Sequence, residues 1–190
     1  MHEKYTTEAF IVTIRNSKEA DRIVSFFTQD FGLISVLFTG VRNSGSKFKG
    51  FLEVGNKCFI TVVKGRSIYR GTDIVASEVM KLTKENRSSF LRSLLLIQKL
   101  VRGEEKNETL FETLKAIHVF LHRRIYTKET LECIECIGAM RILAALGYGE
   151  TFDQNISLVG SITDADVLKA LEHKPHLIKL INLALAESQL

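Results

Sequence analysis

The sequence predicts an α+β protein in which a small β-barrel or sandwich is followed by an all-helical half. Up to about Val79, short segments rich in β-branched and aromatic residues alternate with glycine-bearing turns, a pattern typical of strands. After the stretch KENRSS, apolar residues recur at every third or fourth position, as on amphipathic helices. We therefore expect two domains, residues 1–84 and 85–190.

Five strands are expected in the first domain. In chain order their sequences are AFIVTIR, RIVSFFT, LISVLFTGV, CFITVVKG and SIYRGTDIVASEV. The last two are predicted to form a hairpin, because Cys58, Ile60 and Val62 alternate onto one face and Lys64-Gly65 can reverse the chain.

The second domain is expected to pack helix on helix. The predicted helices cover about 91–101, 110–121, 128–146, 161–173 and 175–189. Ser88 or Ser89 can cap the first, and Thr163 with Asp166 three residues later resembles a capping box. Pro175 is placed in the first turn of the last helix, where its missing N–H costs least.

Positive charge is concentrated in one part of the chain. The net charge is +4, but residues 42–70 hold seven lysines and arginines against a single carboxylate, Glu53. Such an excess favours a polyanionic partner, because each neutralised phosphate releases a counterion. A solvated basic surface is the alternative interpretation of the same charges.

The loop TGVRNSGSKFKG, residues 39–50, combines three cations with three glycines. Gly40 and Gly45 have the spacing of a phosphate-binding P-loop, but Ser46 and Lys47 follow in inverted order, and no helix is expected next. The loop therefore favours contact with a nucleic-acid backbone over a bound nucleotide.

The sequence indicates the compartment in which the protein is found. No basic start leads into an apolar run, and no apolar stretch approaches the ~18 residues of a membrane span. The sequence has three cysteines, an odd number and too few for a disulfide framework. This suits a reducing compartment. We expect a cytoplasmic protein without membrane association.

Two pairs in the helical half have metal-ligand spacing. His118 and His122 are four residues apart, and Cys133 and Cys136 three apart. Both pairs also fit apolar helical stripes, and this core interpretation is favoured. No nucleophile with an evident base stands out, so we expect no enzyme and no cofactor; a metal-dependent nucleic-acid enzyme using the two histidines is a rival reading.

The segment EADRIVSFFTQDFG, residues 19–32, followed by TGVRNSGSKFKGFLE, resembles the N-terminal region of the bacterial recombination mediators of the RecO family. The similarity covers about residues 9–53, and the order of strands then helices extends it to LAALGY at 143–148. Many members have a four-cysteine zinc module after that point, whereas residues 149–160 here contain no cysteine.

The resemblance implies an N-terminal OB-fold barrel and a C-terminal helical domain. It further implies a recombination mediator, associated with the nucleoid, that binds single- and double-stranded DNA and anneals complementary strands. Its implied partners are RecR, the C-terminal tail of the single-strand-binding protein in a groove between helices, and RecA, which it helps to load.

Seven residues are predicted to contact DNA. Arg42, Lys47 and Lys49 would hold phosphates, with Phe48 between the lysines either stacked on bases or folded back onto the barrel. Lys57, Arg66 and Arg70 would extend this basic track, although strand alternation prevents them from sharing one face. The alternative function is an adaptor whose barrel is a scaffold for protein contacts.

Overall fold

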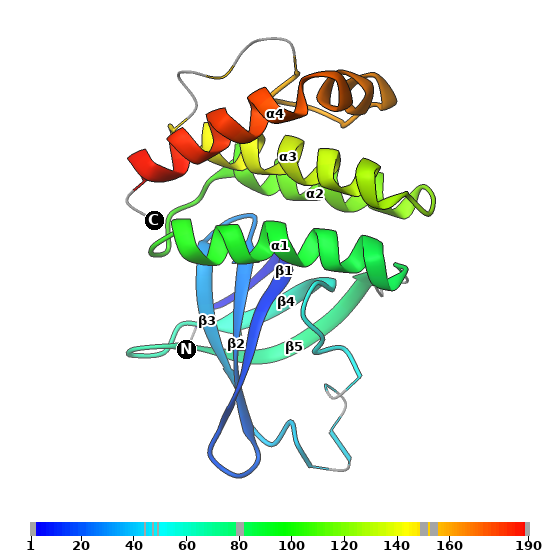
Figure 1. Cartoon of the computed structure of the whole chain (residues 1–190). Helices are drawn as coiled ribbons and strands as arrows, with labels where there is room; N and C mark the ends of the chain where they lie inside the picture. Colours follow the sequence, from blue (N-terminus) through cyan, green and yellow to red (C-terminus); the bar gives the residue numbers. More distant parts are fainter. Residues whose placement is uncertain are drawn as a thin grey trace. The chain divides into compact units, whose positions relative to one another are not determined.

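The computed structural model describes residues 3–43, 45–46, 48, 50–78, 82–148, 152 and 156–188. The chain forms two compact units (Figure 1). The barrel unit comprises residues 1–80 and 102–106, and the helical unit comprises 81–101 and 107–190. The short segment 102–106 therefore belongs with the barrel, although its sequence lies between two helices.

The barrel unit is a closed five-stranded barrel (Figure 1). Its strands are β1 (Lys4–Ser17), β2 (Asp21–Thr28), β3 (Gly32–Phe38), β4 (Lys57–Val63) and β5 (Tyr69–Glu78). They are joined in the order β1-β2-β3-β5-β4, with β4 returning to β1; β3 and β5 are parallel and the other pairs antiparallel. This is the OB-fold arrangement, so the predicted fold class is confirmed.

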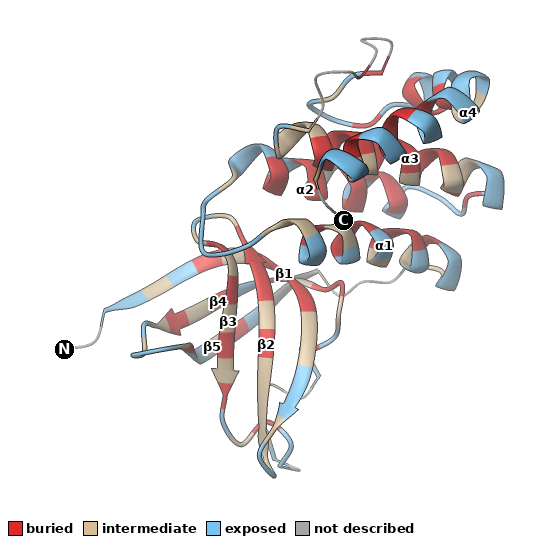
Figure 2. Cartoon of the chain, turned by 60° about the vertical axis from the view of Figure 1, so that its left-hand side comes forward, coloured by how far each residue is buried: buried red, intermediate tan, exposed pale blue. Residues whose placement is uncertain are grey.

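Alternation along the strands fills the barrel interior. On β4, Cys58, Ile60 and Val62 are fully buried, as the hairpin pattern predicted, and their neighbours point outward. Figure 2 shows the same banding of buried and half-buried residues along β3. A period of two describes β3 and β4, whereas β1 is buried continuously from Ala9 to Val12 and β2 from Phe26 to Thr28, so these parts of the two strands are covered on both faces.

The segment 102–106 packs tightly on the barrel. The Tyr69 hydroxyl donates a hydrogen bond of 3.2 Å to Glu104 Oε2. Gly32 has φ of +65°, and a Cβ added there would lie 2.2 Å from the carbonyl oxygen of Glu105. Glycine is required at this position on two grounds: the left-handed backbone and the close approach of another backbone.

The helical unit contains α1 (Lys84–Leu100), α2 (Glu108–His122), α3 (Lys128–Ala145) and α4 (Asp164–Glu187). The predicted start of α1 was wrong. Thr83, rather than Ser88 or Ser89, is the N-cap, and its hydroxyl accepts from Asn86 N at 3.3 Å. Ser88 Oγ instead donates to Lys84 O at 2.9 Å within the first turns of the helix. A serine hydroxyl inside a helix can donate its hydrogen bond to a backbone carbonyl one turn earlier. A serine is therefore not by itself a sign of a helix start.

The predicted break at Pro175 was also wrong, because α4 continues through this residue. Buried apolar residues lie on both sides of it, among them Val167, Ala170, Leu177 and Leu180. Packing of α4 against α3 therefore outweighs the lost N–H bond, and Figure 1 shows the two parts of α4 running in different directions, as expected at a proline. The capping box of Thr163 and Asp166 is confirmed.

A buried arginine ties α3 to the chain that precedes α4. Arg141 Nε donates to Ser157 O at 2.8 Å and Nη1 donates to Gly160 O at 2.6 Å. Nη2 lies 3.9 Å from Asp166 Oδ2, and the Arg141 side chain has no exposed surface. Burial lowers the pKa of Arg141, and the Asp166 carboxylate opposes that shift.

Among the residues that the structure describes, every helix is too short or too polar to cross a membrane.

Candidate nucleic-acid interface

The turn between β4 and β5 forms a basic hollow of about 660 Å³. The described residues that line it are Val63, Lys64, Gly65, Arg66, Ser67, Ile68 and Arg70, three cations and no carboxylate. Gly65 keeps the turn tight, since a Cβ there would lie 2.2 Å from Ile68 O. The hollow, which we call the hairpin hollow, thus offers clustered positive charge of the kind that accepts phosphates.

The loop at 39–50 is anchored to the turn between β1 and β2. Gly40 N donates to Asp21 Oδ1 at 2.9 Å, and Arg42 N donates to Ala20 O at 3.0 Å. The exposed Arg42 side chain donates through Nη1 to Glu19 O at 2.9 Å. A guanidinium has five N–H donors, so one bond orients the group while others can reach a phosphate. Lys47 and Lys49 lie outside the described residues.

Phe48 folds back onto the barrel. Its ring is 5.5 Å from that of Phe38 in an edge-to-face arrangement, and it packs against the barrel core. Of the two orientations considered for this side chain, the structure has the inward one. Contact of Phe48 with bases would require the ring to leave this position, and it stays a prediction.

Lys57 lies away from the hairpin hollow, at the opposite end of β4. Its Nζ is 3.0 Å from Glu8 Oε1, and only 16% of its side chain is exposed. An ion pair with a neighbouring strand offsets its charge, so Lys57 has less to offer a polyanion than Arg66 or Arg70, which are exposed.

Register adds a residue that the sequence did not single out. Arg70 on β5 is opposite Leu37 on β3, Leu37 is opposite Ile23 on β2, and Ile23 is opposite Arg15 on β1. Paired residues share a face, so Arg15 and Arg70 flank two half-exposed aliphatic side chains on the outer face. The sequence did contain a signal for Arg15: it follows Ile14 at the end of the first predicted strand, and this alternation predicts that Arg15 points outward.

In the helical unit His118 and the two cysteines are buried, whereas His122 is exposed. His118 is buried, its ring lies 4.3 Å from that of His122, and Phe90 meets it edge-to-face at 5.2 Å. Burial raises the pKa of the Cys133 thiol and raises that of Cys136 to about 11. Within the described residues no three histidine, cysteine, aspartate or glutamate side chains group as metal ligands would.

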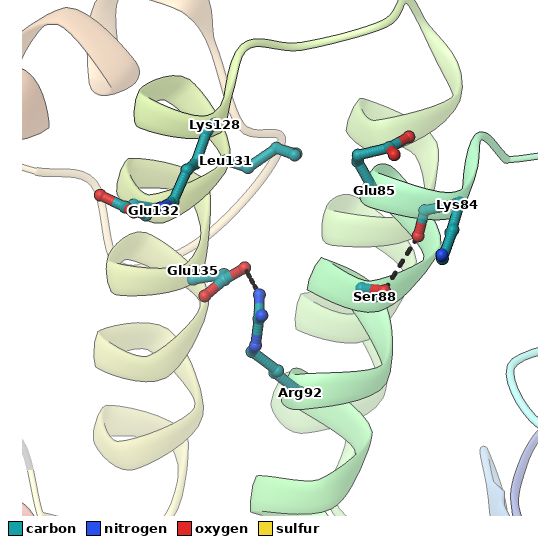
Figure 3. A pocket seen from close by; sticks show the side chains of 8 residues that line it. All are labelled: Lys84, Glu85, Ser88, Arg92, Lys128, Leu131, Glu132 and Glu135. Carbon is teal, nitrogen blue, oxygen red and sulfur yellow. Dashed lines mark hydrogen bonds and ion pairs between the residues drawn. The ribbon is translucent and has the colours of Figure 1, made fainter.

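Two hollows border the N-terminal part of α3. The first, about 460 Å³, lies between α1 and α3 (Figure 3). Its cations Lys84, Arg92 and Lys128 are matched by three glutamates, and Arg92 is ion-paired with Glu135. Balanced charge of this kind does not favour a polyanion.

The second hollow, about 300 Å³, lies between α3 and α4 and is largely apolar. Cys136, Ala139, Ile178 and Ile181 form its apolar part, and its charged lining residues are Lys174, Glu132 and Glu135. We call it the α3–α4 groove.

The barrel matches a known family. The family model described as "Recombination protein O N terminal" matches residues 1–80. The DNA repair protein RecO of Chlorobium limicola is 26% identical over 153 residues, which cover 78% of this chain and 58% of that protein. RecO of Chloroherpeton thalassium is 23% identical over 180 residues, 88% of this chain and 68% of that protein.

RecO of Myxococcus xanthus is 30% identical over 120 residues, 60% of this chain and 48% of that protein. The matched part thus spans roughly half to two thirds of these relatives' length. The resemblance inferred from the motifs is confirmed: residues 1–80 match the RecO N-terminal family model, and relatives named DNA repair protein RecO align with most of the chain.

Proposed function

We propose that this protein acts in DNA repair as a non-enzymatic recombination mediator. It binds single- and double-stranded DNA by the phosphate backbone, brings complementary strands together, and assists the loading of RecA with RecR. Relatives named DNA repair protein RecO support this proposal. The observation on which it chiefly rests is the hairpin hollow, where three cations gather among the described lining residues without a carboxylate.

Backbone recognition follows from the kind of groups present. Arg42, Arg66 and Arg70 are exposed guanidiniums on loops or at a strand start, and the hydroxyl of Ser67 lines the hairpin hollow with Arg66 and Arg70. Such groups bind phosphate oxygens without reading base edges. Binding should therefore depend weakly on sequence and steeply on salt, as a protein that must accept any broken chromosome requires.

The double substitution Arg42→Ala/Lys47→Ala is expected to weaken DNA binding and flatten its salt dependence. Two lost phosphate contacts should reduce the slope of log K against log salt by about 1.4 for a single strand. Arg66→Ala/Arg70→Ala should act in the same direction. Fluorescence anisotropy of a labelled oligonucleotide across a salt series measures both quantities.

The matched control is Lys169→Ala/Lys179→Ala, which removes two exposed cations from α4. Its affinity should stay within about twofold of the wild type. Equal losses in all three variants would indicate general charge attraction rather than these loops. A wild-type protein that does not bind DNA at low salt would favour the adaptor function instead.

The α3–α4 groove supports a second element of the proposal, the docking of the single-strand-binding protein's tail. Its apolar floor suits an aromatic residue at the end of a peptide, and Lys174 is the cation that could meet a peptide carboxylate, beside the carboxylates of Glu132 and Glu135 that also line the groove. Lys174 is ion-paired with Glu132, so a peptide carboxylate would compete for a cation already held at the groove.

Ile178→Ser is expected to reduce tail-peptide affinity about tenfold, because it removes an apolar contact from the groove. The comparison variant is Leu168→Ser, an equally apolar and 61% exposed residue of α4 that is not among the residues lining the groove. Anisotropy of a labelled peptide measures the effect. Binding that survives both Ile178→Ser and removal of the peptide's final residues would contradict docking in this groove.

A further inference from the structure

An exposed apolar pair lies on the outer face of the barrel. Phe59 on β4 is 45% exposed and Val75, directly opposite it on β5, is 58% exposed. Within the described part of the barrel unit, the other large apolar residue with comparable exposure is Phe51, at 37%. Apolar residues this exposed and directly paired form a continuous surface, which we call the Phe59 platform.

The surroundings of the Phe59 platform are polar, with one ion pair and one further carboxylate in the adjoining row. Glu8, opposite Phe59 on β1, is paired with Lys57 at 3.0 Å, so its charge is compensated. In the next outward row, Thr6 Oγ1 lies 2.9 Å from Thr61 Oγ1, and Asp73 is opposite Thr61. Hydroxyls beside a flat apolar face can hydrogen-bond the edge of a nucleobase or a sugar.

The same two strands lead from the Phe59 platform to the hairpin hollow. Val63, four residues after Phe59, pairs with Arg70 on one side and with Lys4 on the other. At about 3.3 Å per residue, roughly 13 Å separates the two rows. One short stretch of nucleic acid can therefore reach both the apolar pair and the cations, and this charge complementarity selects a nucleic acid over an apolar protein partner.

We propose that the Phe59 platform stacks an unpaired nucleobase of a single strand whose phosphates are held by the hairpin hollow. Every base offers a flat face to such a ring, so stacking adds affinity without sequence preference. In a duplex the base faces are covered by their neighbours, so the Phe59 platform acts on single strands alone. The inference rests on the proposed DNA binding and adds to it the source of a preference for unpaired DNA.

The test is Phe59→Leu, which keeps an apolar side chain and removes the aromatic ring. Anisotropy titrations would use a labelled oligothymidylate and a labelled hairpin duplex with the full chain. We expect about tenfold weaker binding to the single strand, with duplex binding unchanged. Phe51→Leu makes the same chemical change at the other exposed phenylalanine and should leave both affinities within about twofold.

Single-strand affinity unaltered by Phe59→Leu would overturn the inference, as would equal losses for single strand and duplex. A changed sedimentation coefficient with unaltered DNA binding would overturn it in favour of contact between two copies of the chain. If the wild type binds neither probe, the proposed function fails first, and this result is distinct from failure of the Phe59 platform alone.

Discussion

Arg141→Met is expected to destabilise the helical unit by about 4 kcal/mol, because breaking a buried ion pair from one side costs roughly 3–5 kcal/mol. Methionine can fill much of the space, but the carbonyl oxygens of Ser157 and Gly160 lose charged donors at 2.8 and 2.6 Å. Asp166, which is only 7% exposed, would also lose the guanidinium near its carboxylate. Urea unfolding followed by helical circular dichroism gives the change in free energy of unfolding.

Two comparison variants sharpen this test. Arg141→Lys keeps the positive charge but offers donors from a single nitrogen, so it should lie between the wild type and Arg141→Met. Arg102→Met removes an exposed arginine and should change stability by at most about 0.5 kcal/mol. If Arg141→Met lowers the free energy of unfolding by less than about 1 kcal/mol, the Arg141 contacts contribute little to the stability of the helical unit.

Gly32→Ala is expected to destabilise the barrel unit by about 3 kcal/mol, combining left-handed backbone strain of about 1–2 kcal/mol with a steric term of about 1–3 kcal/mol. The strain arises from φ of +65°, and the steric term from Glu105, whose carbonyl oxygen would be 2.2 Å from the new Cβ. The clash is with backbone, so no side-chain rotation relieves it. Thermal or urea unfolding measures the sum.

Two other glycines separate the contributions. Gly103 has φ of +90° with nothing within 4 Å of an added Cβ, so Gly103→Ala should show the backbone strain alone. Gly50 has neither a positive φ nor a near neighbour, and Gly50→Ala should be close to neutral. If Gly32→Ala costs no more than Gly103→Ala, the contact with Glu105 contributes nothing to stability.

The barrel could be predicted from sequence because its signals are local. Cys58, Ile60 and Val62 alternate within one strand, and the hairpin that follows needs a glycine at a position that the sequence marks. The ends of the helices were harder. Pro175 has a strong local preference to begin a helix, but α4 continues through it where buried residues on both sides pack against α3.

The candidate site was predictable in its charge and less so in its geometry. A count of cations marks residues 42–70, yet it cannot tell that Lys57 is paired with Glu8, a residue 49 positions earlier, because that contact depends on register between β1 and β4. The exposure of Phe59 has the same origin. Its alternation with Ile60 predicts an outward position, whereas the exposed valine opposite it becomes visible once the β4–β5 register is known.

The return of residues 102–106 to the barrel has a consequence for how the protein can be divided. Because the chain passes from one unit to the other and back again, neither unit is a continuous piece of the gene. A fragment that stops after β5 would lack the partner of the Tyr69 hydroxyl and the backbone that lies against Gly32. Transfer of the barrel strands alone into another protein would therefore leave out the segment 102–106, which belongs to the same unit.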